Sequence, residues 1–395
     1  MIVQKYKDML GMKSVIREMS EYANKRGKEI GYENVFDYSL GNPSVPVPEK
    51  FNAVIKELLD TREPIALHGY SPSHGLPEVR EKIAASLKQR FGLPYQMEDI
   101  FMTSGAAGAI AHAVRAVADI GDEIIAFAPY FPEYGPYISE TGAVLKVVPP
   151  DTESFQINFE AFASMCSEKT AAVLINTPNN PSGIAYSTAT IERLSEILKE
   201  KEAKFGHPIY IISDEPYREI IFKGADNPCI SRIYDNTLMC YSFSKSLSIP
   251  GERIGYVAVC PNCKDAALIT DMCTQISRGI GHNCPSSLIQ LAVAELLDET
   301  SELSVYETNM NILYEELTKL GFTCVKPGGT FYIFPKAPVP DAKEFCEDAL
   351  KYDLCLVPGD TFGCPGYFRM SYCIQTEKVE RSLEAIRKIA RDYGM

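Results

Sequence analysis

The sequence contains no tryptophan and only five histidines among 395 residues. The histidines do not cluster, no HExxH motif occurs, and the one CxxC, from Cys260 to Cys263, has no second cysteine or histidine pair at ligand spacing. A structural zinc site needs four such ligands, so we expect no metal site. The twelve cysteines accompany no secretion signal, which predicts free thiols and a cytoplasmic location.

Long hydrophobic runs and basic stretches are also absent. The N-terminal stretch MIVQKYKDMLGMKSVIREMS carries scattered charges, unlike a signal peptide or the ~20 apolar residues of a membrane span. Lys and Arg total 39 against 52 Asp and Glu, which gives a net charge of −13. Such an acidic surface repels nucleic acid and anionic lipid, so we expect neither nucleic acid nor a membrane as a partner.

The sequence does contain an alternation of helical patterns and short apolar segments. The apolar segments lack strict alternation, as strands do when a parallel sheet is covered on both faces. They are Glu123–Phe127, Ala171–Ile175, Ile209–Ile212, Thr237–Tyr241 and Gly255–Val259. Helical patterns such as Ala106–Ala118 and Thr190–Lys204 separate several of them, which predicts an α/β fold with a mainly parallel sheet and helices on both sides.

The chain is longer than one hydrophobic core usually supports, which predicts two domains. Residues 14–23 place apolar side chains on one helical face, and a long helical stretch runs from Pro285 to about Leu320. Strands near Thr330–Phe334 and Phe368–Ser371 and an amphipathic helix at Glu377–Tyr393 follow it. We expect an N-terminal helix and arm packed with the small domain, a large domain, and an interdomain helix with the C-terminal small domain, at residues 1–45, 46–285 and 286–395.

Polar and reactive side chains follow four consecutive predicted strands. Ligands of open parallel sheets bind beyond the carboxyl ends of the strands, which meet at one edge. The four strands run into Ala128-Pro129-Tyr130-Phe131, the segment Asn176 to Gly183, Asp214-Glu215-Pro216-Tyr217 and Ser242-Phe243-Ser244-Lys245. A purely structural domain would seldom show this arrangement, so we expect a functional site at this edge.

Two features of the sequence indicate an anion site beside an amine. Lys245 follows two serines and precedes Arg253, whereas most lysines after a strand are only solvated ends. Hydroxyls, an amine and a guanidinium so close together suit an anion next to a nucleophilic amine. The small residues of TSGAA at 103–107 open a helix whose free N–H groups could also receive an anion, although close packing is the alternative explanation.

The sequence resembles class I/II aminotransferases of pyridoxal-phosphate fold type I over nearly its whole length. The matching motifs are YSLGNPSVP at 38–46, YSPSHGLPEVREKIA at 70–84, TSGAA at 103–107, NTPNNPSG at 176–183, SDEPY at 213–217, SFSKSLSIPGERIGY at 242–256, PGGTFYIF at 327–334, PGDTFG at 358–363 and FRMSY at 368–372. The resemblance implies a large domain with a mainly parallel seven-stranded sheet covered by helices, plus a smaller αβ domain.

The resemblance also implies a cofactor, pyridoxal 5′-phosphate, and roles for individual residues. Lys245 would hold the cofactor as a Schiff base and act as the general base, which requires an amine pKa near neutrality. Asp214 would keep the ring nitrogen protonated. Asn180 and Tyr217 would hydrogen-bond the 3′-oxygen.

The remaining site residues implied by the resemblance bind phosphate, ring and substrate. The phosphate would be held by Gly105, Ala106, Ala107, Ser242, Ser244 and Arg253, with Tyr70 reaching over from the second subunit of a homodimer with shared active sites. Phe131 would stack on the cofactor, Arg369 would clamp the substrate α-carboxylate, and Gly41 would line the same pocket.

Two positions of the sequence bear on the choice of a dicarboxylate substrate. Relatives that favour dicarboxylates use either a lysine at the place of Ala107, which is missing here, or an arginine seven residues before the proline at Pro285, where Arg278 stands. An exposed arginine at a helix end is the alternative interpretation of Arg278. We expect ping-pong transfer from an L-amino acid, aspartate above alanine or aromatic amino acids, to a 2-oxo acid such as 2-oxoglutarate. A pyridoxal-phosphate C–S β-lyase is the rival enzyme, and a non-catalytic cofactor-binding module is a third class.

Overall fold

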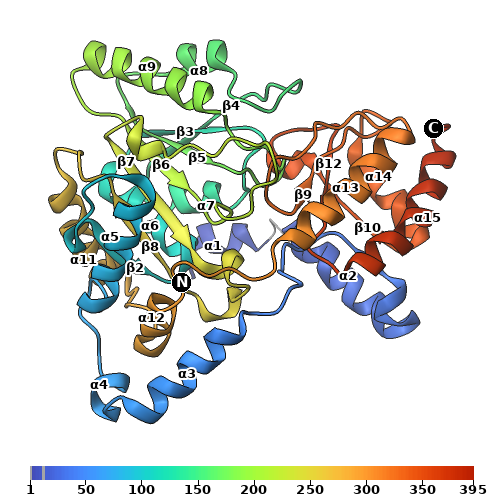
Figure 1. The fold of residues 1–395 in the computed structure, drawn as a ribbon. Helices are drawn as coiled ribbons and strands as arrows, with labels where there is room; N and C mark the ends of the chain where they lie inside the picture. The colour runs from blue at the N-terminus through green and yellow to red at the C-terminus, as the bar shows by residue number, and fades with distance from the viewer. Residues whose placement is uncertain (1, 11–13) are drawn as a thin grey trace.

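The computed structural model describes residues 2–10 and 14–395, and its largest sheet has seven strands in the order β2-β8-β7-β6-β5-β3-β4 (Figure 1). The strands are β2 (Ile100–Thr103), β3 (Glu123–Phe127), β4 (Val144–Val148), β5 (Thr170–Asn176), β6 (Tyr210–Asp214), β7 (Thr237–Ser242) and β8 (Gly255–Val259). Strands β7, β6, β5, β3 and β4 are parallel, whereas β8 runs antiparallel to both of its neighbours. The predicted mainly parallel sheet is confirmed, although β2 and β4 were not predicted.

Helices cover both faces of this sheet (Figure 1). One face carries α6 (Gly105–Val117), α7 (Tyr134–Ser139) and α11 (Ala266–Ile280), and the other carries α8 (Phe159–Met165) and α9 (Thr188–Phe205). Ile124 packs in the α6 cluster while its neighbour Ile125 packs in the α9 cluster. Successive strand residues point to opposite faces, so a strand covered on both sides has an apolar interior, as the buried strand β5 has between its polar end residues Thr170 and Asn176.

A further group of helices packs at the β2–β8 edge. It contains α3 (Glu49–Thr61), α4 (Pro64–His68), α5 (Pro77–Phe91), α10 (Phe243–Ser246) and α12 (Ser287–Ala294). The predicted helical stretch from Pro285 to Leu320 is interrupted, because α12 ends at Ala294 and α13 (Ser304–Lys319) begins ten residues later. Within the gap, the Ser301 N–H donates to the Ser246 carbonyl at 2.8 Å, which ties the irregular segment to α10.

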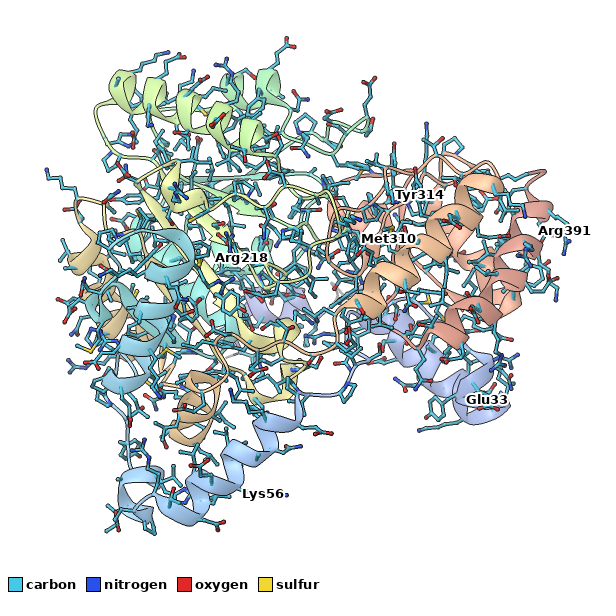
Figure 2. The ribbon with its side chains drawn as sticks, viewed as in Figure 1. Glu33, Lys56, Arg218, Met310, Tyr314 and Arg391 are labelled. Atoms are coloured by element: carbon cyan, nitrogen blue, oxygen red, sulfur yellow. The ribbon has the colours of Figure 1, made fainter. Side chains whose placement is uncertain are left out.

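The C-terminal part forms a smaller αβ unit with the N-terminal helix beside it. Its three-stranded antiparallel sheet contains β11 (Val357–Pro358), β12 (Phe368–Ser371) and β9 (Tyr332–Ile333), and its helices are α13, α14 (Ala342–Ala349) and α15 (Thr376–Asp392). β1 (Phe36–Asp37), which follows α2 (Val15–Ile30), pairs with β10 (Leu354–Cys355). Figure 2 shows Met310 of α13 inside this unit and Arg391 on its outer surface. The domain boundaries themselves remain a prediction.

The first helix, α1 (Gln4–Met9), is short and has no buried residue. Within the part of the chain that the structure describes, no helix is both long and apolar enough to span a membrane. The same residues contain no group of three or more His, Cys, Asp or Glu side chains arranged to hold a metal ion.

Candidate active site

A cavity of about 260 Å³ lies beyond the carboxyl ends of the parallel strands, between the large sheet and the smaller unit. Most of the predicted site residues line it: Gly41, Ala106, Ala107, Phe131, Asn180, Asp214, Tyr217, Ser242, Ser244, Lys245, Arg253 and Arg369. They come from segments far apart in the sequence, which meet because β3, β5, β6 and β7 lie in adjacent positions with the same direction. The predicted convergence at one edge of the sheet is therefore observed.

Lys245 lies in α10, the short helix that begins directly after β7. Its Nζ donates a hydrogen bond to the Gly41 carbonyl at 2.7 Å. A Cβ on Gly41 would overlap the Tyr332 hydroxyl, so the main chain can pass this close only with glycine at that position. Burial lowers the pKa of Lys245 to about 8, which gives the amine a substantial neutral fraction near physiological pH. A neutral amine can serve as a nucleophile and as a base.

Asp214 is the last residue of β6 and is buried. Tyr134 Oη donates to its Oδ2 at 2.5 Å, and the Asn176 amide lies 3.4 Å from the same oxygen. Oδ1 has no hydrogen-bond partner among the described residues. Burial raises the pKa of Asp214 to about 7, because no cation in the described part of the chain offsets the loss of water around the carboxylate.

This unpaired oxygen supplies a test of whether the residues fit pyridoxal phosphate. A buried carboxylate oxygen without a donor is costly, and the protonated nitrogen of a pyridine ring would provide both the donor and the opposite charge. Phe131 lines the same cavity and offers an aromatic face for such a ring. The arrangement around Asp214 therefore fits the cofactor.

The opposite end of the cavity suits the cofactor's phosphate. Helix α6 begins at Gly105, where φ is +79°, and a Cβ there would come within 2.9 Å of Arg253 Nη2. Arg253 Nη2 also donates to the Ser104 carbonyl at 3.2 Å, which holds the guanidinium beside the helix start. The hydroxyls of Ser242 and Ser244 lie 2.8 Å apart at the same end. A helix N-terminus, a guanidinium and two hydroxyls together form a phosphate cradle.

Arg369 lies on β12 and is only 1% exposed. Its Nη1 donates to Asn180 Oδ1 at 3.0 Å and its Nη2 donates to the Ser39 carbonyl, whereas Nε has no partner among the described residues. The guanidinium also stacks over the Tyr332 ring at 4.6 Å. No acidic side chain in the described part of the chain pairs with it, so its remaining donors suit a carboxylate that arrives with the substrate.

Three predicted residues do not line the cavity. Gly105 lies next to it, behind Arg253, whereas Tyr70 and Arg278 line a separate hollow of about 660 Å³. The Tyr70 side chain is fully exposed at 104%. One chain alone therefore does not bring Tyr70 and Arg278 to the other predicted residues.

The structure also reveals neighbours that the sequence analysis missed. Tyr332 lies 3.2 Å from the Tyr217 hydroxyl, and Asn176 Oδ1 accepts a hydrogen bond from the Asn180 N–H at 2.6 Å. Asn176 could have been found, because it ends β5 at the predicted edge of the sheet. Tyr134 gave no such signal, because it opens a helix of six residues and does not follow a strand directly.

Comparison with known proteins agrees with this geometry. The family described as "Aminotransferase class I and II" matches residues 33–386. An aspartate aminotransferase of Thermotoga maritima is 31% identical over 90% of this chain and 91% of its own length. An aromatic-amino-acid aminotransferase of Thermococcus litoralis is 29% identical over 92% of this chain and 93% of its own. The crystal structure of an aminotransferase from Eubacterium rectale is 44% identical, covers 100% of both chains and has a TM-score of 0.96.

The family match spans both the large sheet and the smaller unit, and so includes every segment that lines the cavity except the N-terminal helix. The members of this family use pyridoxal phosphate, in agreement with the fit of Asp214, Lys245 and the helix α6 N-terminus. The chain belongs to the class I and II aminotransferases and is an enzyme that transfers amino groups.

Proposed function

We propose that this aminotransferase binds pyridoxal phosphate through Lys245 and moves the amino group of an L-amino acid, with aspartate favoured, to a 2-oxo acid such as 2-oxoglutarate. The observation that carries the proposal is the shared cavity, which places a buried carboxylate with a free oxygen, an amine with a lowered pKa and an unpaired guanidinium around one space. When bound there, pyridoxal phosphate supplies an electron sink that makes the α-proton of the amino acid removable.

The residues around the cavity divide the work between binding and proton transfer. Arg369 binds the α-carboxylate of the amino acid and so orients the Cα–H bond. Lys245 takes the proton from Cα of the amino donor in the first half-reaction and gives a proton to Cα of the new amino acid in the second, a task that suits an amine whose pKa is about 8. Asp214 holds a proton on the ring nitrogen, and the Tyr217 hydroxyl and the Asn180 amide hydrogen-bond the ring oxygen. Gly41 closes the wall beside Lys245.

The phosphate end anchors the cofactor while the other end reacts. Arg253, with the hydroxyls of Ser242 and Ser244 and the N–H groups of Ala106 and Ala107, binds the phosphate, and Phe131 stacks on the ring. A phosphate held at a helix start by several donors stays in place through both halves of a ping-pong reaction.

The preference for aspartate requires one more cation. Among the described residues, Lys245, Arg253 and Arg369 are the basic side chains that line the cavity, and each already has a role. Arg278 shares its separate hollow with Tyr70, which suggests that both act in the site of a second subunit. A two-fold homodimer would carry Arg278 to the distal carboxylate of aspartate and Tyr70 to the phosphate. A relative named as an aspartate aminotransferase supports this preference, whereas one named for aromatic amino acids supports the alternative.

Reduction with borohydride tests the cofactor link directly. The wild-type protein, loaded with pyridoxal phosphate and reduced, should carry a stable label on Lys245, located by peptide mass spectrometry. Lys245→Ala should lose the label while still binding the cofactor more weakly through the phosphate cradle. Lys223→Ala, on an exposed lysine of the same domain, should label normally. A covalent label on the Lys245→Ala protein would refute the assignment, and pyruvate and ammonia formed from a cysteine conjugate without an oxo-acid acceptor would indicate a β-lyase instead.

A further inference from the structure

Tyr134 reaches the buried side of Asp214 from a different part of the sheet. It opens α7, the helix that follows β3, and its side chain is 1% exposed. In the sheet, β5 lies between β3 and β6. The Tyr134 side chain therefore crosses the end of β5 to reach Asp214 at the end of β6. Its Oη donates to Asp214 Oδ2 at 2.5 Å, a distance typical of a hydrogen bond to an ionised oxygen.

Asn176 supports the same side of the carboxylate. Its amide nitrogen donates to the Asp214 main-chain carbonyl at 2.9 Å and lies 3.4 Å from Oδ2. Oδ2 thus has both of its partners within the protein, while Oδ1 has none among the described residues and Asp214 lines the cavity. The two oxygens are therefore unequal, and only one is available to a ligand.

No cation among the described residues stabilises the charge of this carboxylate. The titratable groups of the described residues that face it are Tyr134 and Tyr137 from α7, Glu215 and Tyr217 beyond β6, and Cys240 on β7. In the described part of the chain, the Tyr134 hydroxyl is the strongest donor to the charged oxygen. A carboxylate buried among neutral and acidic groups depends on such a donor to remain ionised.

We propose that Tyr134 is a positioning residue for Asp214, holding Oδ2 so that the negatively charged carboxylate presents Oδ1 to the ring nitrogen of pyridoxal phosphate. The inference rests on the proposed role of Asp214 and adds a residue that does not itself touch the cofactor. Without the hydroxyl, the carboxylate would be freer to rotate and easier to protonate, because a hydrogen bond to the charged form lowers its pKa. A neutral Asp214 could not keep the ring nitrogen protonated.

A purely structural role for Tyr134 makes a different prediction. Its ring contacts Phe131 edge-on at 5.7 Å and stacks on Tyr130 at 6.5 Å. Tyr134→Phe keeps these ring contacts and removes only the hydroxyl, so a structural tyrosine would tolerate it. Tyr130→Phe is the matched control, because it removes the hydroxyl of the stacked neighbour, which forms no hydrogen bond with Asp214.

The first measurement is made on the protein without cofactor. Infrared difference spectroscopy follows the protonated carboxyl band of Asp214, which is identified by its loss in Asp214→Asn. Tyr134→Phe should shift the titration midpoint upward by about one to two pH units, the effect of losing a hydrogen bond to a charged group. Tyr130→Phe should leave it unchanged. A midpoint in Tyr134→Phe equal to that of the wild type would overturn the proposal.

A second measurement uses the wild-type side chain and so does not depend on how the variant folds. With ring-labelled tyrosine, protonation of Asp214 should shift one tyrosine C–O stretching band, and Asp214→Asn should abolish that shift. Absence of a coupled tyrosine band would also contradict the proposal.

Measurements on the enzyme loaded with pyridoxal phosphate distinguish the role of Tyr134 from the role of Asp214. The rate of the half-reaction with aspartate and the dissociation constant of the cofactor are measured for Asp214→Asn and for Tyr134→Phe. If Asp214→Asn changes neither, the proposed role of Asp214 fails. If Asp214→Asn slows the half-reaction by orders of magnitude while Tyr134→Phe matches the wild type, only the role of Tyr134 fails. We expect Tyr134→Phe to slow the half-reaction about tenfold or more.

Discussion

Removal of the Arg369 guanidinium should lower kcat/KM for every amino-acid substrate by an amount that the structure predicts. Arg369 is buried, donates to Asn180 and to the Ser39 carbonyl, and has no acidic partner of its own in the described part of the chain. In Arg369→Leu, the α-carboxylate of the substrate would enter a buried place without a counter-charge. Breaking a buried pair in this way costs about 3–5 kcal/mol. At about 1.4 kcal/mol per factor of ten, kcat/KM should fall by roughly two to four orders of magnitude.

The assay compares kcat/KM for aspartate, alanine and phenylalanine in three variants. Arg369→Lys keeps the charge without the two-pronged donor geometry and should fall between wild type and Arg369→Leu. Arg387→Leu is the control. Arg387 lies on the distant helix α15 and pairs with Glu316 at 2.6 Å, so its replacement should leave kcat/KM within about twofold of wild type. A melting curve confirms that each variant is folded. A loss below tenfold in Arg369→Leu, or a loss confined to aspartate, would refute the assignment.

Two further predictions test the proposed homodimer. Arg278→Leu should lower kcat/KM for aspartate about thirtyfold or more, as expected when a buried charge pair loses one partner, while alanine and phenylalanine are hardly affected. Equal losses on all three substrates would exclude a role in side-chain selection. Lys245→Ala chains mixed with chains crippled at Tyr70 should regain activity approaching about a quarter of wild type, since a two-fold dimer places both defects in one site and leaves the other intact. Activity that only equals the average of the parents, after full subunit exchange, would place Tyr70 in the site of its own chain.

The convergence of the site could be predicted because parallel strands impose it. Residues directly after β3, β5, β6 and β7 share one edge once the sheet is parallel, so Phe131, Asn180, Tyr217 and Lys245 were placed together without any knowledge of their contacts. The apolar segments also gave bounds close to the observed ones, and Glu123–Phe127 matched β3 at both ends. The hydrophobic pattern of the segments predicts the strands, and the parallel topology predicts that their ends meet.

Other features depend on tertiary contacts that leave no local pattern. The antiparallel direction of β8 follows from its pairing with β2 and β7, since its apolar sequence suits either direction. The break after α12 is hidden by Leu296, Leu297 and Leu303, which continue an apolar pattern while the Ser301 main chain is drawn to Ser246. Tyr134 reaches Asp214 from a helix of only six residues, too short for periodicity to show its orientation.

The stretch from Ser39 to Gly41 contacts two basic side chains of the cavity through its main chain. The Ser39 carbonyl accepts from Arg369, the Gly41 carbonyl accepts from Lys245, and the Leu40 carbonyl between them accepts from the Ser371 hydroxyl at 3.2 Å. For enzyme engineering, this means that a side-chain library at the exposed Leu40 would alter the shape of the wall and leave the charge environment of both cations largely as it is, whereas Gly41 has to stay glycine. A redesign that aims to retune the amine would have to change the path or length of the loop itself.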